Sequence, residues 1–199
     1  MLILASRSPR RSEILRHAGI EFIATAADVD ESVHSAENPE DYVKRVAQLK
    51  ALAVKGGEGD IVLGADTVVV IDGEILGKPK DPADAVRMLK SLADRKHEVV
   101  TGVCFRRGEE LTVDWAVTKV WVIALTQGEI DDYVASGEPM DKAGAYAIQG
   151  LASKFIERID GSYSNVVGLP VDLVYKHLRM TRGGADAPVR AGPPGPALP

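Results

Sequence analysis

The sequence predicts a mixed α/β fold built around a long twisted sheet. Helix-like and strand-like segments alternate in the first half of the chain, whereas strand-like segments cluster in the middle. Proline and polar cap residues mark the expected helix starts, and turns that contain glycine separate the expected strands. With 199 residues, the chain can bury a core in one domain or in two small lobes.

The first expected elements are a short buried strand and a helix. The run Leu2–Ala5 is apolar throughout. Ser8 followed by Pro9 is typical of an N-cap and a first helical position, and Gly19 is expected to end this helix. The same chemistry at Asn38-Pro39 predicts the start of a second helix.

Two strands and a hairpin are expected next. Residues 61–65 and 68–71 are apolar, which indicates two buried strands with a polar pair between them. Asp72-Gly73 favours a two-residue hairpin turn into residues 74–76. A third helix is expected to begin at Asp81-Pro82.

The second half predicts further strands, two helices and a tail. The expected elements are strands near 97–106 and 111–125, a helix over about 127–135, a hairpin between 155–159 and the segment after Ser162, and a last helix over roughly 170–180. Thr126 and Glu129 have capping-box spacing, which supports the first of these helices. Gly, Pro and Ala dominate residues 183–199, so we expect a folded domain over residues 1–182 and a disordered tail.

Composition narrows the class of function. Hydrophobic residues make up 45% of the chain and charged residues 27%, as in an ordinary soluble protein. The net charge of −5 argues against stable nucleic-acid binding, which needs a basic surface, so any anion site must be local. No apolar run approaches the roughly 20 residues that span a bilayer, and the first residues do not resemble a secretion signal. We therefore expect a cytoplasmic protein without a membrane partner.

Cysteine and histidine residues give no disulfide or zinc pattern. Cys104 is the single cysteine and lies in an expected strand, which favours a buried, inert thiol over a nucleophile. The four histidines lack the spacing of zinc ligands. Neither residue type therefore indicates a catalytic centre.

The first candidate site is the basic segment between the first strand and the first helix. It reads Ser6-Arg7-Ser8-Pro9-Arg10-Arg11. Unpaired N–H groups and the helix dipole suit a phosphate at a helix start, whereas arginines there are unfavourable without an anion. Guanidinium groups bind phosphate oxygens in pairs. From these residues alone, a phosphate site and a solvated basic turn both stay open.

Two charged residues stand in apolar surroundings. Lys50 follows Val43 and Val46 at helical spacing, so it is expected on the apolar face of the second helix. There it needs a carboxylate or a phosphate as partner, unless it snorkels to the edge of that face. Asp66, followed by Thr67, interrupts the apolar run of the expected strands. This aspartate holds a divalent metal ion or activates water, or else it occupies a turn or bulge.

Three further segments add candidates. Glu31 belongs to the acidic stretch 28–31, which is either a solvated loop or the source of a magnesium ligand. Lys78 follows the expected hairpin and can reach a phosphate, although its segment lacks P-loop spacing. Gln149 lies in a segment of small residues, 141–150, and offers both the donor and the acceptor that reading a base edge requires.

Taken in order, these segments resemble the Maf family of nucleotide pyrophosphatases. The matching stretches are Leu4-Ala5-Ser6, Ser8-Pro9-Arg10-Arg11, Asp30-Glu31, Lys50-Ala51, Gly64-Ala65-Asp66-Thr67, Gly77-Lys78-Pro79 and Gly168-Leu169-Pro170. The resemblance covers about residues 2–180. It implies two lobes around a cleft, similar to the inosine triphosphate pyrophosphatases, and a divalent metal cofactor, Mg²⁺ or Mn²⁺.

The resemblance also implies a reaction and roles within it. Water attacks the α-phosphate of a nucleoside triphosphate, diphosphate leaves, and Asp66 is the proton acceptor. Glu31 and Asp66 are the implied metal ligands. The implied substrate-binding residues are Ser6, Arg10, Arg11, Lys50, Thr67, Lys78 and Gln149. Among these, Arg10, Thr67 and Gln149 match positions tied to substrate choice, whereas Arg7 matches a variable position.

One segment indicates the subtype. Residues 144–150 resemble the members that act on dTTP and UTP, whereas members that act on 7-methyl-GTP differ here. The implied function is hydrolysis of dTTP and UTP, modified pyrimidine nucleotides included, to the monophosphate and diphosphate. A pyrophosphatase for 7-methyl-GTP or another modified nucleotide is one alternative, and a non-catalytic regulator of septum formation or cell division is another. A homodimer is compatible with each of these functions.

Overall fold

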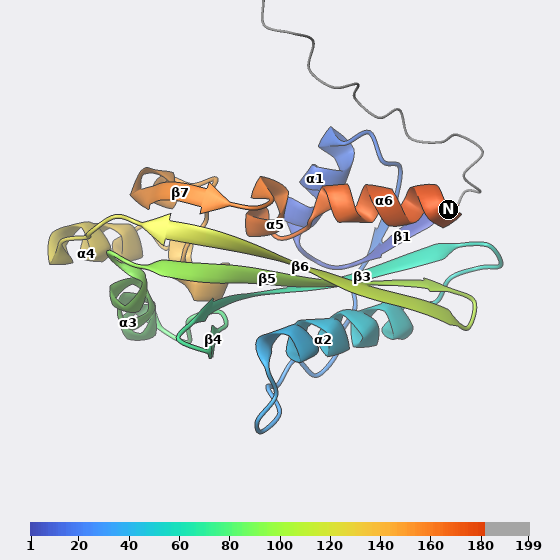
Figure 1. The fold of residues 1–199 in the computed structure, drawn as a ribbon, viewed down its shortest axis with the longest axis horizontal. Coiled ribbons are helices and arrows are strands. Elements are labelled where there is room, and N and C mark those ends of the chain that lie inside the picture. Colours follow the sequence, from blue (N-terminus) through green and yellow to red (C-terminus); the bar gives the residue numbers. More distant parts are fainter. Residues whose placement is uncertain (182–199) are drawn as a thin grey trace, which may run out of the picture.

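A computed structural model describes residues 1–181, which contain one seven-stranded sheet flanked by helices (Figure 1). The strands are β1 (Leu2–Ala5), β2 (Ile23–Thr25), β3 (Ile61–Ile71), β4 (Glu74–Leu76), β5 (Lys96–Arg107), β6 (Glu110–Val122) and β7 (Ile156–Asp160). The helices are α1 (Pro9–His17), α2 (Pro39–Ala53), α3 (Pro82–Leu92), α4 (Gln127–Ala135), α5 (Tyr163–Val167) and α6 (Val171–Thr181). Three short 3-10 helices are η1 (Glu138–Asp141), η2 (Ala143–Ala145) and η3 (Leu151–Phe155). The predicted mixed α/β fold is confirmed, while the tail predicted over residues 183–199 lies outside the described residues.

The sheet leaves one stretch of β3 without a neighbouring strand on one side. Its order is β2-β1-β3-β5-β6-β7, and β4 also pairs with β3. β1 is parallel to β3 and pairs only as far as Gly64, whereas the antiparallel β4 pairs from Val69 onward. Within the described chain, the β3 edge between these two residues therefore has no strand partner. The carboxyl end of β1 meets this gap, and ligands commonly bind at such ends.

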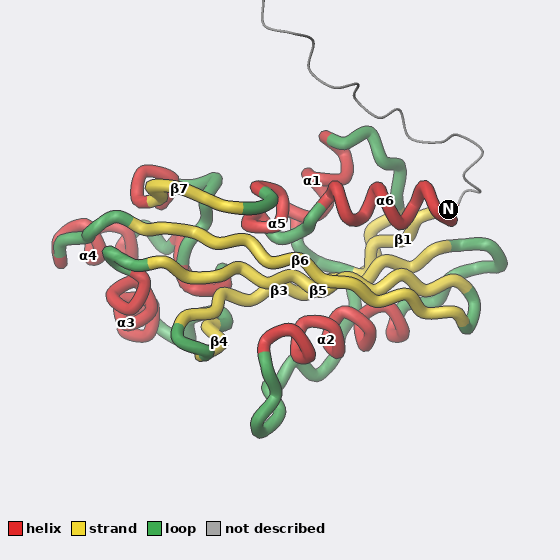
Figure 2. Tube along the Cα trace, viewed as in Figure 1, coloured by secondary structure: helices red, strands yellow, loops and turns green. Residues whose placement is uncertain are grey.

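Helices cover both faces of the sheet and divide the molecule into two lobes. Figure 2 shows α1, α5 and α6 on one face and α2 on the other. A separate cluster of buried side chains joins α3, α4 and the 3-10 helices to the far end of the sheet. β3, β5 and β6 run through both lobes (Figure 1). Separate hydrophobic clusters thus share one set of long strands.

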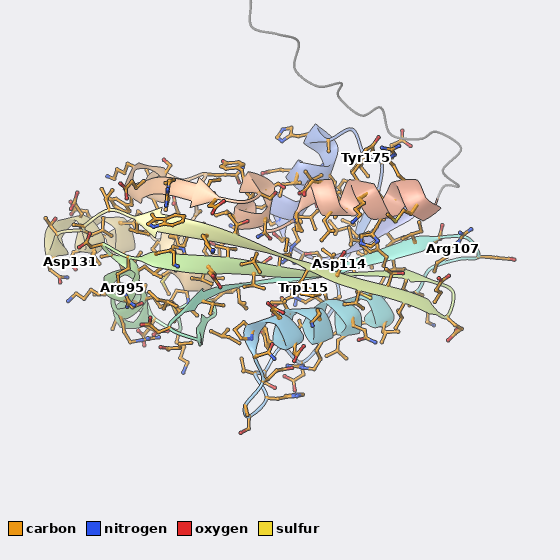
Figure 3. The ribbon with its side chains drawn as sticks, viewed as in Figure 1. Arg95, Arg107, Asp114, Trp115, Asp131 and Tyr175 are labelled. Atoms are coloured by element: carbon orange, nitrogen blue, oxygen red, sulfur yellow. The ribbon has the colours of Figure 1, made fainter. Side chains whose placement is uncertain are left out.

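Successive side chains of β6 point to opposite faces of the sheet and contact a helix on each face. Asp114 and Trp115 are adjacent and point to opposite faces of the sheet (Figure 3). Asp114 Oδ2 lies 2.9 Å from Nε2 of His177 on α6. On the other face, the ammonium group of Lys44 on α2 lies 4.6 Å from the centre of the Trp115 ring. The strand is therefore fixed to a helix on each side.

Side-chain caps start the helices where the sequence predicts them. Asn38 accepts a hydrogen bond from the first turn of α2, and Asp81 does the same for α3. Thr126 and Glu129 form the predicted capping box at the start of α4. The predicted Asp72-Gly73 turn joins β3 to β4, with both residues at positive φ.

Three elements differ from the prediction. Residues 61–71 form one continuous strand rather than two, because β5 pairs with β3 from Val62 to Val70. Asp66 therefore lies in mid-strand, and its interpretation as a turn or bulge residue is wrong. The three-residue strand β2 was not predicted, since its side chains are exposed and lack an apolar pattern of useful length.

The predicted hairpin partner after Ser162 is also wrong. Ser162 is the N-cap of the short helix α5, and its side chain accepts a hydrogen bond from the Asn165 N–H. β7 instead pairs with β6, which ends at Val122. Within residues 1–181, no helix combines the length and the apolar character needed to cross a membrane.

A buried histidine links β5 to the segment after η2. His97 is 1% exposed, and its Nε2 lies 2.7 Å from the hydroxyl of Tyr146. Its Nδ1 is buried and has no hydrogen-bond partner among the described residues. Burial lowers the pKa of His97 to about 4, so the ring is neutral at neutral pH.

This burial predicts a pH-dependent contribution to stability. Below a pH of about 6.5, the pKa of His97 in the unfolded chain, the unfolded chain binds a proton at His97 and the folded chain does not. The free energy of unfolding therefore falls as the pH drops toward 4. The stability difference between wild type and His97→Gln should therefore change by about 3 kcal/mol in favour of the variant from pH 7 to pH 4. Urea unfolding at several pH values measures it, and a difference independent of pH would contradict the assignment.

Candidate active site

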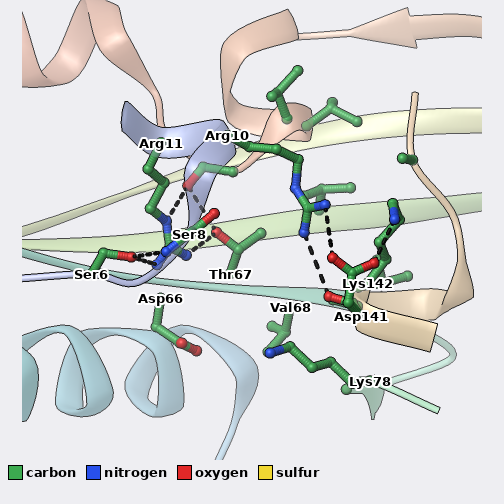
Figure 4. A pocket seen from close by; sticks show the side chains of 18 of the residues that line it. Ser6, Ser8, Arg10, Arg11, Asp66, Thr67, Val68, Lys78, Asp141 and Lys142 are labelled. Carbon is green, nitrogen blue, oxygen red and sulfur yellow. Dashed lines mark hydrogen bonds and ion pairs between the residues drawn. The ribbon is translucent and has the colours of Figure 1, made fainter. Parts of the chain in front are cut away.

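A cleft of about 580 Å³ lies at the unpaired stretch of the β3 edge (Figure 4). All nine residues singled out from the sequence line it, although they come from six separate segments. They are Ser6, Arg10, Arg11, Glu31, Lys50, Asp66, Thr67, Lys78 and Gln149. Residues that were not chosen as site residues also line it, among them Arg7, Tyr42, Asp141, Lys142 and Tyr146. The fold thus brings together in one cleft all the site residues identified from the sequence.

A buried lysine between two carboxylates forms the floor of the cleft. Lys50 Nζ lies 2.7 Å from Asp66 Oδ1 and 2.8 Å from Glu31 Oε1. Lys50 and Asp66 are buried, whereas the side chain of Glu31 is half exposed. Carboxylate partners, rather than snorkelling, therefore satisfy the lysine on the apolar face of α2.

Two glycines let α2 come close enough for this contact. A Cβ atom on Gly64 would lie 2.1 Å from the carbonyl oxygen of Ala47, and one on Gly102 would lie 2.4 Å from that of Val43. Any side chain at either strand position would therefore push α2 away from the sheet. Lys50 follows Ala47 by about one helical turn, so this close packing brings its ammonium group to Asp66, two residues after Gly64 and on the same face of β3.

The electrostatics of Asp66 suit a base. Burial raises the pKa of Asp66, and the charges of Lys50 and Arg11 oppose that rise. Its Oδ1 accepts the lysine hydrogen bond, and nothing among the described residues donates to Oδ2. The carboxylate is therefore a stronger base than an exposed aspartate and keeps one oxygen available to the cleft.

Arg11 binds protein groups on all sides of its guanidinium. Its Nε donates to the Gly168 carbonyl at 2.8 Å, and Nη1 donates to the Ala65 carbonyl at 2.9 Å and to Ser6 Oγ at 3.2 Å. Its Nη2 donates to Thr67 Oγ1 at 3.0 Å. Burial lowers the pKa of Arg11, an effect that nearby carboxylates oppose. Four of the five N–H groups are thus used within the protein.

These bonds change the roles expected for Arg11 and Thr67. The sequence predicted that Arg11 binds substrate together with Arg10, but most of its donors are already used by the edge of β3, by Ser6 and by the Gly168 carbonyl just after α5. The Thr67 hydroxyl also lies 2.9 Å from Thr101 Oγ1 and 3.2 Å from the Gly168 carbonyl. Both side chains therefore join β3 to Gly168, and within residues 1–181 one Arg11 N–H has no acceptor.

The cations available to an anion are more exposed. Arg10 reaches Asp141 only through long contacts of 3.4 and 3.5 Å. Lys78 is exposed and extends into the cleft past Val68 (Figure 4). Arg7 is also largely exposed and makes one 3.5 Å contact with Asp28. Such side chains can turn toward a ligand without breaking strong internal bonds.

The start of α1 adds backbone donors to this group. Ser8 occupies the N-cap position but makes no side-chain hydrogen bond to the first turn. Its own N–H instead donates to Ser6 Oγ at 3.2 Å. The uncapped N–H groups of the first turn therefore suit an anion. Six cationic side chains and three carboxylates line the cleft of a chain whose net charge is −5, so the excess of positive charge there is local.

Gln149 lies on the opposite wall, in a turn. The Gly150 N–H donates to the Ala147 carbonyl at 3.1 Å and closes this turn. The Gln149 side chain is exposed, and no hydrogen bond to it occurs within the described chain. Just before the turn, Tyr146 is fixed by His97. Gln149 therefore presents a free donor and a free acceptor beside a rigid anchor.

Two supporting residues were missed from the sequence. The Tyr42 hydroxyl donates to the Glu31 carbonyl at 2.8 Å, and Arg45 Nη2 donates to the Ser32 carbonyl at 2.8 Å. They fix the loop that carries Glu31 to α2. Tyr42 precedes Lys50 by eight residues and therefore shares its helix face, which is the signal that could have identified it.

Comparison with known proteins places this cleft in context. The family model for Maf-like proteins matches residues 1–181. A dTTP/UTP pyrophosphatase of Citrifermentans bemidjiense is 51% identical over 182 residues, covering 90% of this chain and 94% of that protein. One of Geotalea uraniireducens is 53% identical over 182 residues, covering 89% and 93%. The structure of the Staphylococcus aureus Ham1 protein covers 90% of this chain and 98% of its own at a TM-score of 0.52 and 16% identity, which supports the fold.

The Arg11 network predicts a specific stability defect. Lysine keeps the charge in Arg11→Lys but cannot reach all four acceptors, so the Gly168 and Ala65 carbonyls lose arginine hydrogen bonds. The free energy of unfolding should fall by about 2–4 kcal/mol. Arg10→Lys, which removes only long contacts, should cost less than about 1 kcal/mol. Equal losses in the two variants, measured by urea denaturation, would contradict the network's importance.

Proposed function

Because this chain belongs to the Maf-like protein family, we propose that it hydrolyses dTTP and UTP to the nucleoside monophosphate and diphosphate. Asp66 carries the proposal, because a buried carboxylate in mid-strand with one oxygen open to a basic cleft suits water activation. Relatives about half identical to this chain carry the name dTTP/UTP pyrophosphatase. The segment around Gln149 supports the same subtype.

The triphosphate would lie against the start of α1. Arg10 and Lys78 are the exposed cations that can turn onto phosphate oxygens, and the uncapped N–H groups of α1 supply further donors. Arg11 fixes that helix against the edge of β3 and adds a buried positive charge next to the proposed phosphate site. These groups would also stabilise the negative charge that develops on departing diphosphate.

Glu31 and Asp66 fit a divalent metal such as Mg²⁺ or Mn²⁺. Magnesium is usually held by one or two carboxylates, with phosphate and water oxygens completing its octahedron. Both carboxylates converge on Lys50 Nζ and face the cleft. No group of three or more His, Cys, Asp or Glu residues that could hold a metal ion occurs in residues 1–181, so substrate would complete the shell. When bound, such a metal neutralises phosphate charge and acidifies water.

Asp66 would accept the proton of the attacking water. The oxygen of that water bonds to the α-phosphorus, and the bond from this phosphorus to the bridging oxygen of the diphosphate breaks. The raised pKa of Asp66 strengthens it as a base, while Lys50 favours its ionised form before the reaction. Lys50 thus orients the base through Oδ1 and leaves Oδ2 for the proton.

Gln149 would select the base from the opposite wall. Its amide can both donate to and accept from the edge of one pyrimidine base. A purine arranges its donors and acceptors differently. The cytoplasmic location, the homodimer and the lack of stable nucleic-acid binding stay predictions.

A nucleotide panel tests this proposal. The kcat/KM for diphosphate release should be highest with UTP and dTTP in the presence of Mg²⁺ and lower with CTP, ATP, GTP and 7-methyl-GTP. No diphosphate should be released after EDTA is added. Preference for 7-methyl-GTP would overturn the subtype, and no diphosphate from any nucleotide would overturn the enzyme.

Replacing the base should separate chemistry from binding. Asp66→Asn should lower turnover of UTP by about 100-fold or more, because the amide cannot take the proton. Binding of UTP, measured by calorimetry, should weaken by less than about tenfold, since Asp66 is not a phosphate donor. Asp72→Asn, at the exposed turn after β3, is the matched control and should behave as wild type. Near-normal diphosphate release by folded Asp66→Asn would refute the assignment.

A further inference from the structure

The turn that carries Gln149 has no regular secondary structure to fix it. It lies between η2 and η3, and its only backbone bond of its own joins Gly150 N–H to the Ala147 carbonyl among the described residues. Ala147, Ile148 and Gln149 all line the cleft. A side chain that selects a base must be held in place, so the support of this turn determines what Gln149 can do.

Two side chains outside the cleft hold the end of this turn. The Tyr133 hydroxyl donates to Glu138 Oε1 at 3.0 Å, and Glu138 Oε2 accepts from the Leu151 N–H at 3.0 Å. Burial, reinforced by the hydrogen bond to Glu138, raises the pKa of Tyr133. The hydroxyl therefore stays protonated and donates to Glu138, whose other carboxylate oxygen contacts the end of the turn.

The pair is itself rigid. Tyr133 is buried in the core of its lobe, with its ring edge-to-face against Phe155 at a centroid distance of 5.7 Å. Glu138 begins η1 directly after Gly137, which has a φ of 76° and turns the chain back from α4. The two side chains thus connect a packed helix to the turn.

Gly150 gives independent support. A Cβ atom on this residue would lie 2.2 Å from Glu138 Oε1 and 2.5 Å from its Cδ. The φ of Gly150 is −102°, which any residue can adopt, so backbone conformation does not require glycine here. The glycine instead admits the Glu138 carboxylate against the backbone of the turn.

We propose that Tyr133 and Glu138 are positioning residues that set nucleobase selectivity by fixing the turn 147–150. This inference rests on the proposed role of Gln149 in reading the base. Neither side chain lines the cleft or contacts the group formed by Glu31, Lys50 and Asp66. Their loss should therefore loosen base recognition and leave the chemical step intact. This separates them from residues that only maintain the fold.

Tyr133→Phe and Glu138→Gln test the proposal directly. Phenylalanine keeps the ring packing and loses the hydroxyl, and glutamine replaces one accepting oxygen by a donor. In each variant, KM for UTP should rise about three- to tenfold with kcat within about twofold, as expected for one or two lost hydrogen bonds. The ratio of kcat/KM for UTP to that for GTP should fall. Gly128→Ala, an exposed position on α4 with open space around its Cβ site, is the matched control.

Two further variants keep the test decisive. Gly150→Ala displaces the Glu138 carboxylate without altering either positioning residue and should reproduce the loss of selectivity. Tyr133→Phe added to Gln149→Ala should cause little further loss, because both act through the same contact. Thermal unfolding of each variant establishes that it is folded.

The outcomes distinguish this inference from the function on which it rests. A wild type that releases no diphosphate from any nucleotide would overturn the proposed function and this inference with it. Active wild type with unchanged UTP selectivity in Tyr133→Phe and Glu138→Gln would overturn the positioning role alone. A fall in kcat at constant KM, or a full additive loss in the double variant, would also overturn it.

Discussion

A carboxylate and an ammonium group lie 2.7 Å apart beneath the middle of the sheet, and the arrangement of the cleft follows from that pair. Burying either charge alone would be costly, and their attraction offsets this only with good geometry and a further partner. Glu31 supplies that partner from the loop before α2. The close packing of α2 on Gly64 and Gly102 makes the geometry possible. The pair therefore fixes the helix, the loop and the strand relative to one another.

The ends of two strands convert this buried pair into an open site. β1 stops pairing at Gly64 and β4 starts at Val69, so the edge of β3 next to Asp66 faces the cleft rather than another strand. Arg11 takes over the bonding there by donating to the Ala65 carbonyl and tying it to Gly168. An arginine predicted to bind phosphate thus satisfies the strand edge, and we propose that the more exposed Arg10 and Lys78 bind the phosphates.

Local chemistry explains which features the sequence could predict. The caps at Asn38, Asp81 and Thr126 depend on neighbours three residues away, and each is found as predicted. The continuity of β3 could not be predicted in this way, because a mid-strand aspartate is tolerated only when Lys50 reaches it. The helix after Ser162 was missed because serine suits both a turn and an N-cap. The site residues were identified by type, but the role of Arg11 depends on acceptors up to 157 positions away.

The central claim is that burial raises the pKa of Asp66 while Lys50 restrains the rise and leaves a usable base. Carboxyl ¹³C NMR of aspartate-labelled protein, with the Asp66 signal assigned through Asp66→Asn, measures that pKa directly. The burial of Asp66 predicts a value above the ordinary aspartate value of about 3.9 in wild type, and the loss of the Lys50 charge predicts a higher value still in Lys50→Met. A wild-type value at or below the ordinary one, or no change on removal of Lys50, would contradict it.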